Sequence, residues 1–150
     1  MPSHYRETLA GRRRTLGDEH PDTLGSINGM AILLKAQGKL GDAEPLYREA
    51  LAGRRRTLGD EHPDTLGSIN NLGLLLKKQG KLGDAEPLYR EALAGKRRTL
   101  GDEHPDMLDS IFNFARLLWA QGNKAEALEL FRQELEGVRR VLVRLGESEL

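Results

Sequence analysis

The chain is built from a sequence that repeats every 42 residues. The string Leu-Gly-Asp-Glu-His-Pro-Asp begins at Leu16, Leu58 and Leu100. Residues 7–48 and 49–90 differ at only six positions, and a third copy starts alike before it drifts. A period of this length is typical of solenoids, in which each repeat is one supersecondary unit that packs on its neighbours.

The first half of each period predicts an amphipathic helix that begins after His-Pro-Asp. In the first copy, apolar residues recur at the spacing of one helical face: Leu24, Ile27, Met30, Ala31 and Leu34. An aspartate at the start can accept hydrogen bonds from first-turn amides, so we expect the N-caps to be Asp22, Asp64 and Asp106. A glycine ends each helix, because glycine adopts the left-handed conformation at low cost; these are Gly38, Gly80 and Gly122.

The second half of each period predicts another helix, beginning near Asp42 and Asp84. Pro45 and Pro87 are expected in its first turn, where a missing amide costs no internal hydrogen bond. The helix continues through a basic triplet to a leucine–glycine pair. Its apolar face in the first copy consists of Ala43, Leu46, Tyr47, Ala50 and Leu51.

These elements predict an all-α protein of about seven helices, arranged as a right-handed superhelical solenoid of helix-turn-helix repeats. Residues 3–16 match the end of a second helix, so an orphan helix precedes three hairpins at about 22–58, 64–100 and 106–145. Asn123 and Glu126 resemble a capping box at the start of the last helix. We expect residues 1–150 to form a single repeat domain, because a lone hairpin cannot bury its apolar face.

Composition excludes several kinds of protein. The chain has no cysteine, which excludes disulfides and thiolate zinc sites. Its 23 basic and 23 acidic residues cancel, so there is no global attraction to nucleic acid or acidic membranes. No apolar run approaches the ~18 residues of a membrane span, and the N-terminus lacks the apolar core of a signal peptide. We therefore expect a cytoplasmic protein without cofactors.

The repeat resembles the tetratricopeptide family, whose pattern places small residues and an aromatic at fixed positions of the two helices. The middle copy supplies Leu72-Gly73, Leu76, Gly80, Ala85, Tyr89 and Ala92. The period, the run Asn70-Asn71-Leu72 and the Ala-Glu-Pro-Leu-Tyr strings at 43–47 and 85–89 are similar to the kinesin light chain subclass. The third copy departs from the pattern at Glu134, where a small residue is expected.

The resemblance implies a non-enzymatic scaffold that holds an extended peptide in a concave groove lined by the first helices. Light chains favour peptides with a tryptophan among acidic residues. On the family register the groove residues are Asn28, Ile32 and Lys35 in copy one; Asn70, Asn71, Leu74, Lys77 and Lys78 in copy two; and Phe112, Asn113, Arg116 and Trp119 in copy three.

The chemistry of these side chains agrees with an acidic peptide ligand. Asparagine can donate to and accept from a peptide backbone, and lysine and arginine favour carboxylates. The apolar members could hold one hydrophobic anchor. The alternative is that these are ordinary solvated positions, with Phe112 and Trp119 packing in a terminal repeat.

Other recurring residues suggest structural roles. The basic triplets 12–14, 54–56 and 96–98 lie near helix ends, with acidic residues close in sequence, so we expect a solvated, locally balanced face rather than a nucleic-acid or phosphoinositide site.

The histidines His20, His62 and His104 recur once per repeat, too far apart to share a metal ion, and should form turns. Mid-helix glycines at 11, 25, 53, 67 and 95 have no account beyond close packing.

The competing interpretation is a self-associating structural module, end-to-end or domain-swapped, because both terminal helices offer apolar residues. These are Tyr5, Leu9 and Leu16 at one end and Leu135, Val138, Val141, Leu142 and Leu145 at the other. No phosphate-binding glycine loop, Ser-His-Asp arrangement or metal-ligand spacing points to an enzyme, so we expect no catalytic or metal site.

Overall fold

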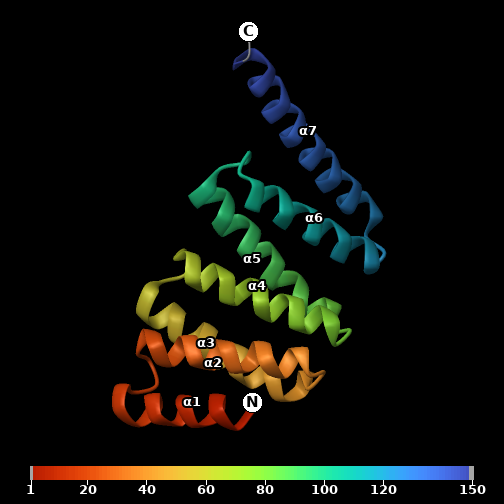
Figure 1. Cartoon of the computed structure of the whole chain (residues 1–150). Helices are drawn as coiled ribbons and strands as arrows, with labels where there is room; N and C mark the ends of the chain where they lie inside the picture. Colours follow the sequence, from red (N-terminus) through yellow and green to blue (C-terminus); the bar gives the residue numbers. More distant parts are fainter. Residues whose placement is uncertain (1, 149–150) are drawn as a thin grey trace. The chain divides into compact units, whose positions relative to one another are not determined.

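The computed structural model describes residues 2–148, and nearly all of this part of the chain is α-helical (Figure 1). Met1, Glu149 and Leu150, which the predicted domain includes, lie outside the described residues. The prediction of an all-α chain of seven helices is confirmed. The helices are α1 (Pro2–Leu16), α2 (Pro21–Ala36), α3 (Leu40–Leu58), α4 (Pro63–Lys78), α5 (Leu82–Leu100), α6 (Pro105–Ala120) and α7 (Lys124–Ser148).

The chain divides into two compact units. Unit 1 ends at Lys81 and contains α1 to α4, and unit 2 begins at Leu82 and contains α5 to α7. Each unit includes one complete helical hairpin, α2 with α3 and α6 with α7. The single repeat domain expected from the sequence stays a prediction. None of the described helices is long and apolar enough to cross a membrane.

The apolar faces expected from the sequence form the core of unit 1. In α2, all five predicted face residues are at most 4% exposed. In α3, Ala43, Tyr47 and Ala50 are at most 2% exposed, so an alanine lies on either side of the buried aromatic. Unit 2 repeats the arrangement with fully buried alanines at Ala115 and Ala127. Small residues at these positions let the helix axes approach to about 8–10 Å.

The N-caps of the first helices are histidines, so the prediction of aspartate caps is wrong. His20, His62 and His104 precede α2, α4 and α6, and the Nδ1 atom of each accepts a hydrogen bond from the amide two residues on, at 3.0–3.1 Å. An accepting Nδ1 carries no hydrogen, so the ring proton lies on Nε2. The aspartates instead lie in the first turn, where their charge complements the positive helix end.

The C-termini of the same helices match the prediction. Gly38 has φ 79°, and its amide donates to the carbonyl of Lys35 at 3.0 Å. The next amide, that of Lys39, donates to the carbonyl of Leu34 at 2.9 Å. This pair of bonds is a Schellman motif, and it recurs at Gly80 and Gly122. The three hairpins therefore turn through the same geometry.

The second helices begin two residues earlier than predicted, at Leu40 and Leu82 rather than near Asp42 and Asp84. Pro45 and Pro87 consequently lie inside the helix and not in its first turn. At this position a proline cannot donate to the carbonyl four residues earlier, so each of these helices lacks one internal hydrogen bond. At the other end, α7 continues to Ser148, beyond the expected stop near Leu145.

The glycine at position 53 allows a close helix contact that the sequence alone did not explain. A β-carbon built on Gly53 would lie 2.4 Å from a methyl carbon of Leu24, and one on Gly137 would lie 2.8 Å from a methyl carbon of Leu108. In both hairpins a leucine of the first helix therefore rests on a glycine of the second. Gly25 differs, because nothing lies within 4 Å of a β-carbon built there.

Alanine at these two kinds of glycine should have opposite effects on stability. Gly25→Ala should raise the free energy of unfolding by roughly 0.5–1 kcal/mol, because it removes backbone freedom from the unfolded chain at an open site. Gly53→Ala should lower it by about 1–3 kcal/mol, because the buried Leu24 must leave its position. Urea unfolding of both variants measures the difference, and stabilisation by Gly53→Ala would contradict the packing described here.

The histidine caps make a second prediction. His62→Ala should lower the free energy of unfolding by roughly 0.5–2 kcal/mol, because the first-turn amide of Asp64 loses its acceptor. His62→Asn should restore most of this loss, since asparagine is among the strongest N-cap residues. Urea unfolding at neutral pH compares the two variants. An equal loss in both would show that the ring acts through its packing and not through its nitrogen.

Candidate peptide-binding faces on the first helices

In unit 1 the residues predicted to line a groove follow helical spacing along α2 and α4. Asn28, Ile32 and Lys35 are separated by four and three residues, as are Asn70, Leu74 and Lys77, so each set forms a stripe on its helix. Ile32 is 49% exposed although it is a large apolar residue. We call the two stripes, together with Asn71 and Lys78, the unit 1 face.

Each helix of the unit 1 face carries a lysine whose positive charge acts on the lysine of the other helix; these are Lys35 of α2 and Lys78 of α4. Burial lowers the pKa of Lys35 below its ordinary value, and the charge of Lys78 lowers it further. These two ammonium groups therefore lie close enough to repel each other. Neither Lys35 nor Lys78 forms an ion pair with any described residue. A carboxylate placed between them would relieve the repulsion.

The asparagines of the unit 1 face are half-buried and differ in how their polar atoms are placed. The side-chain oxygen of Asn28 is buried and accepts no hydrogen bond among the described residues. Asn70 and Asn71 are partly exposed, and no buried unpaired atom is found on either. The asparagine pair on α4 is therefore better placed to contact a ligand than Asn28.

In unit 2 the corresponding residues are on α6, and the two large aromatic ones are accessible. Phe112 is 41% exposed and Trp119 is 46% exposed. The guanidinium of Arg116 lies 5.6 Å from the centre of the Phe112 ring, and the ammonium of Lys124 lies 5.2 Å from the centre of the Trp119 ring. Asn113 is half-buried beside them. These are cation–π distances, so two cations lie on the exposed aromatic surface.

A mostly apolar hollow of ≈ 440 Å³ opens beside Trp119. It is lined by Arg116, Trp119 and Ala120 of α6 and by Leu128 and Phe131 of α7. The rings of Phe112 and Phe131 are 5.8 Å apart, so this aromatic surface extends from one helix to the other. Such a hollow, with a cation on its rim, could accept an apolar side chain with acidic neighbours.

The sequence interpretation missed Leu128 and Phe131. Phe131 occupies the aromatic position of the repeat, where Tyr47 and Tyr89 are almost completely buried, so the repeat pattern gives no sign that it is accessible. Leu128 replaces Glu44 and Glu86 of the earlier copies. An apolar residue at a position that is acidic in both earlier copies was the signal that could have found this surface.

In α5, Tyr89 has a buried hydroxyl without a hydrogen-bond partner among the described residues. Burial raises the pKa of Tyr89 to about 12, and the nearby charge of Arg116 acts in the opposite direction. The neutral phenol is therefore strongly favoured at physiological pH.

The first two residues of each basic triplet bond to other side chains of the chain. The first residue of each triplet bonds the serine of the following first helix: Arg12 with Ser26 at 2.6 Å, Arg54 with Ser68 at 2.8 Å and Lys96 with Ser110 at 2.9 Å. The second residue pairs with the aspartate five residues on: Arg13 with Asp18, Arg55 with Asp60 and Arg97 with Asp102. The triplets therefore serve mainly to connect helices and loops.

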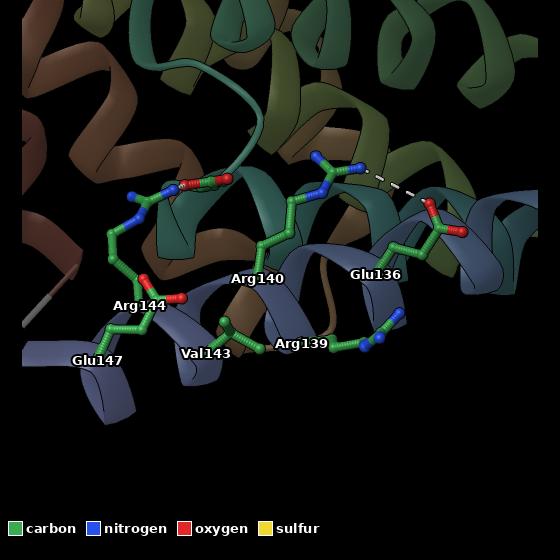
Figure 2. Close-up of a pocket in the computed structure, with 7 residues that line it drawn as sticks. Glu136, Arg139, Arg140, Val143, Arg144 and Glu147 are labelled. Carbon is green, nitrogen blue, oxygen red and sulfur yellow. Dashed lines mark hydrogen bonds and ion pairs between the residues drawn. The ribbon is translucent and has the colours of Figure 1, made fainter. Parts of the chain in front are cut away.

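A second hollow, of ≈ 490 Å³, lies between the end of α7 and the loop before α6 (Figure 2). Its charges are largely paired with each other, Arg140 with Glu136 at 3.6 Å and Arg144 with Glu103. Arg139, by contrast, forms no ion pair with the other residues of the hollow, and Figure 2 draws no dashed line to it. No group of three or more potential metal ligands occurs among the described residues.

Comparison with known proteins identifies the repeat. The tetratricopeptide repeat family matches three overlapping stretches, residues 3–56, 24–98 and 64–140. None of the curated proteins matches the sequence.

Among solved structures, the chain is similar to a putative kinesin light chain with nearly identical TPR-like repeats from Podosopora anserina. The two share 31% identity with a TM-score of 0.84 over 90% of this chain and 64% of that one. BtubC (BKLC) from P. vanneervenii has the same TM-score at 22% identity, over 93% and 56% of the two chains. The Rap conjugation gene regulator of plasmid pLS20, in complex with the Phr* peptide, has a TM-score of 0.69 at 20% identity, over 93% and 37%. The chain thus spans less than two thirds of each of these proteins.

The repulsion on the unit 1 face can be measured directly. Lys78→Ala should raise the pKa of Lys35, because it removes the neighbouring positive charge. Nuclear magnetic resonance titration of the lysine side chains reports this pKa. Lys81→Ala is the matched control, since Lys81 pairs with Glu44 at 3.0 Å and does not act on Lys35. An unchanged pKa of Lys35 in Lys78→Ala would show that the two ammonium groups do not interact.

Proposed function

Because the chain belongs to the tetratricopeptide repeat family, we propose that it is a non-catalytic scaffold that binds an extended acidic peptide along the exposed faces of its first helices. Tetratricopeptide repeats generally mediate protein–protein interaction. The observation that carries the acidic preference is the pair Lys35 and Lys78, which repel each other and have no carboxylate partner among the described residues.

The other side chains of the unit 1 face support a peptide rather than a small anion. Asn70 and Asn71 can donate to and accept from a main chain without reading its sequence. Ile32 and Leu74 add apolar surface beside the lysines. A ligand with alternating backbone, acidic and apolar groups would use all three kinds of contact, whereas an inorganic anion would use only the lysines.

In unit 2 the hollow beside Trp119 would receive an apolar anchor of such a peptide. Arg116 and Lys124 would then face the acidic residues next to the anchor. The related fold of the Rap regulator, whose structure contains a peptide, is compatible with a ligand of this class. The cytoplasmic location expected from the sequence stays a prediction.

A display library of random peptides, selected against the purified chain, tests the proposal. We expect enrichment of an acidic motif with an apolar anchor. Asn70→Ala with Lys77→Ala should weaken the enriched peptide at least ~10-fold, about 1.4 kcal/mol, because it removes one backbone contact and one charge. Titration calorimetry measures the affinity, and Lys39→Ala, at an exposed lysine before α3, is the control. Unchanged affinity in the double variant would remove the unit 1 face as the binding site.

The single tryptophan gives an independent readout for unit 2. Its fluorescence should shift when a peptide with an apolar anchor enters the hollow, because the indole would leave water. A peptide that binds with the affinity predicted above but leaves the emission unchanged would place the anchor elsewhere.

A further inference from the structure

The outer face of α7 carries apolar residues in a heptad pattern. Their spacing alternates between three and four residues over three heptads, which is the pattern of a coiled-coil seam. We call this set the α7 seam, and it consists of Leu128, Phe131, Leu135, Val138, Leu142 and Leu145.

The seam is accessible in the chain. Phe131 is half-buried, and the other five residues are between 40% and 70% exposed, with Leu135 the most exposed. The side of α7 that packs within unit 2 is a different one, with Ala127, Leu130 and Gly137 buried. The seam is therefore a second apolar face that the fold of unit 2 does not need.

Comparison with the earlier copies shows that the seam is a property of the last helix. At three of its six positions the earlier copies have charged residues: Glu86, Lys96 and Glu103 stand where α7 has Leu128, Val138 and Leu145. These substitutions extend the apolar surface along one side of α7.

The same comparison argues against another repeat of this type as the cover. Arg54 and Lys96 bond the serine of the next first helix at 2.8 and 2.9 Å, and this bond recurs from copy to copy. Val138 occupies the corresponding position in α7 and cannot make it. The face is thus suited to an apolar helix and not to the next copy of the repeat.

Two charged residues beside the seam indicate which apolar helix could cover it. Glu134 and Arg139 flank the seam on opposite sides, at the g and e positions of the heptad when Leu135 is at a. Neither forms an ion pair or hydrogen bond with a described side chain. Burial and the charge of Asp109 raise the pKa of Glu134, so this carboxylate lacks a cation.

We propose that α7 pairs with α7 of a second copy of the chain as a parallel, in-register two-stranded coiled coil. In such a pair, a residue at position g contacts the e residue of the partner helix whose number is five higher. Glu134 of each copy therefore contacts Arg139 of the other copy, which gives two such ion pairs per dimer. An antiparallel pair that aligns the same six apolar residues would bring Arg132 against Arg139 of the other copy. Like charges would oppose that arrangement.

The mass of the chain in solution tests the pairing. Light scattering over a wide range of concentration should show twice the mass of the chain, and Leu135→Lys with Leu142→Lys should return it to the single chain. Val143→Lys is the matched control, because Val143 is 51% exposed on the same helix but lies off the seam, and it should stay paired. A wild-type chain of single mass throughout, or a double variant that stays paired, would overturn the proposal. Circular dichroism verifies that each variant is folded.

The orientation is tested by cross-linking, which is simple because the chain has no cysteine. In a parallel, in-register pair, residue 142 of one copy faces residue 142 of the other copy. Leu142→Cys should therefore form a disulfide-linked dimer under mild oxidation, and Val143→Cys should not. An antiparallel pair would place residue 142 opposite Phe131. Failure of Leu142→Cys to cross-link faster than Val143→Cys would exclude the parallel arrangement.

Charge reversal tests the contact between Glu134 and Arg139. Glu134→Arg and Arg139→Glu should each raise the dimer dissociation constant roughly fivefold, and the double reversal should restore it. Additive losses in the double variant would exclude the contact. No seam variant should weaken the binding of an acidic peptide without an apolar anchor to the unit 1 face, which separates this pairing from the proposed peptide binding.

Discussion

The contact of a leucine side chain with a glycine backbone limits how closely the helices approach in the two hairpins α2–α3 and α6–α7. Leu24 rests on Gly53, and Leu108 rests on Gly137, at distances that leave no room for a methyl group. With buried alanines at the neighbouring turns, this contact fixes how closely the two helices approach. The close approach in turn directs the polar stripes of the first helices outward. The candidate binding faces therefore depend on the packing on the opposite side of the same helices.

The basic side chains of the chain fall into two groups, those that bond to other side chains and those that do not. Most arginines of the triplets connect one helix to the next or to a loop, through serines, aspartates and glutamates. The arginines that pair with a carboxylate have part of their charge offset within the chain. Lys35 and Lys78 are different, because they have no such partner among the described residues. A chain with no net charge can thus still carry a local excess of positive charge.

The third copy is where the chain departs from its own repeat, and its departures gather on one surface. Leu128 and Phe131 contribute both to the hollow beside Trp119 and to the α7 seam. Glu134 replaces the buried alanine of the earlier copies and gives the seam its acidic flank. Pairing of α7 would therefore cover part of the hollow, whereas the unit 1 face lies in the other compact unit of the chain.

The sequence by itself determined the number of helices, their order and the glycines at which the first helices end. These features depend on local signals, namely apolar spacing and left-handed glycines, which need no knowledge of distant residues. It did not determine the histidine caps, because the aspartate two residues later has the stronger intrinsic preference for the N-cap position. Only the backbone geometry makes the ring nitrogen of the histidine the acceptor for the first-turn amide. For Gly53 it suggested only close packing and could not identify the contact, because Leu24 is 29 residues earlier in the chain. The heptad pattern of α7 is present in the sequence. Tertiary packing decided which face of this helix stays exposed, because burial depends on how the helices of unit 2 pack.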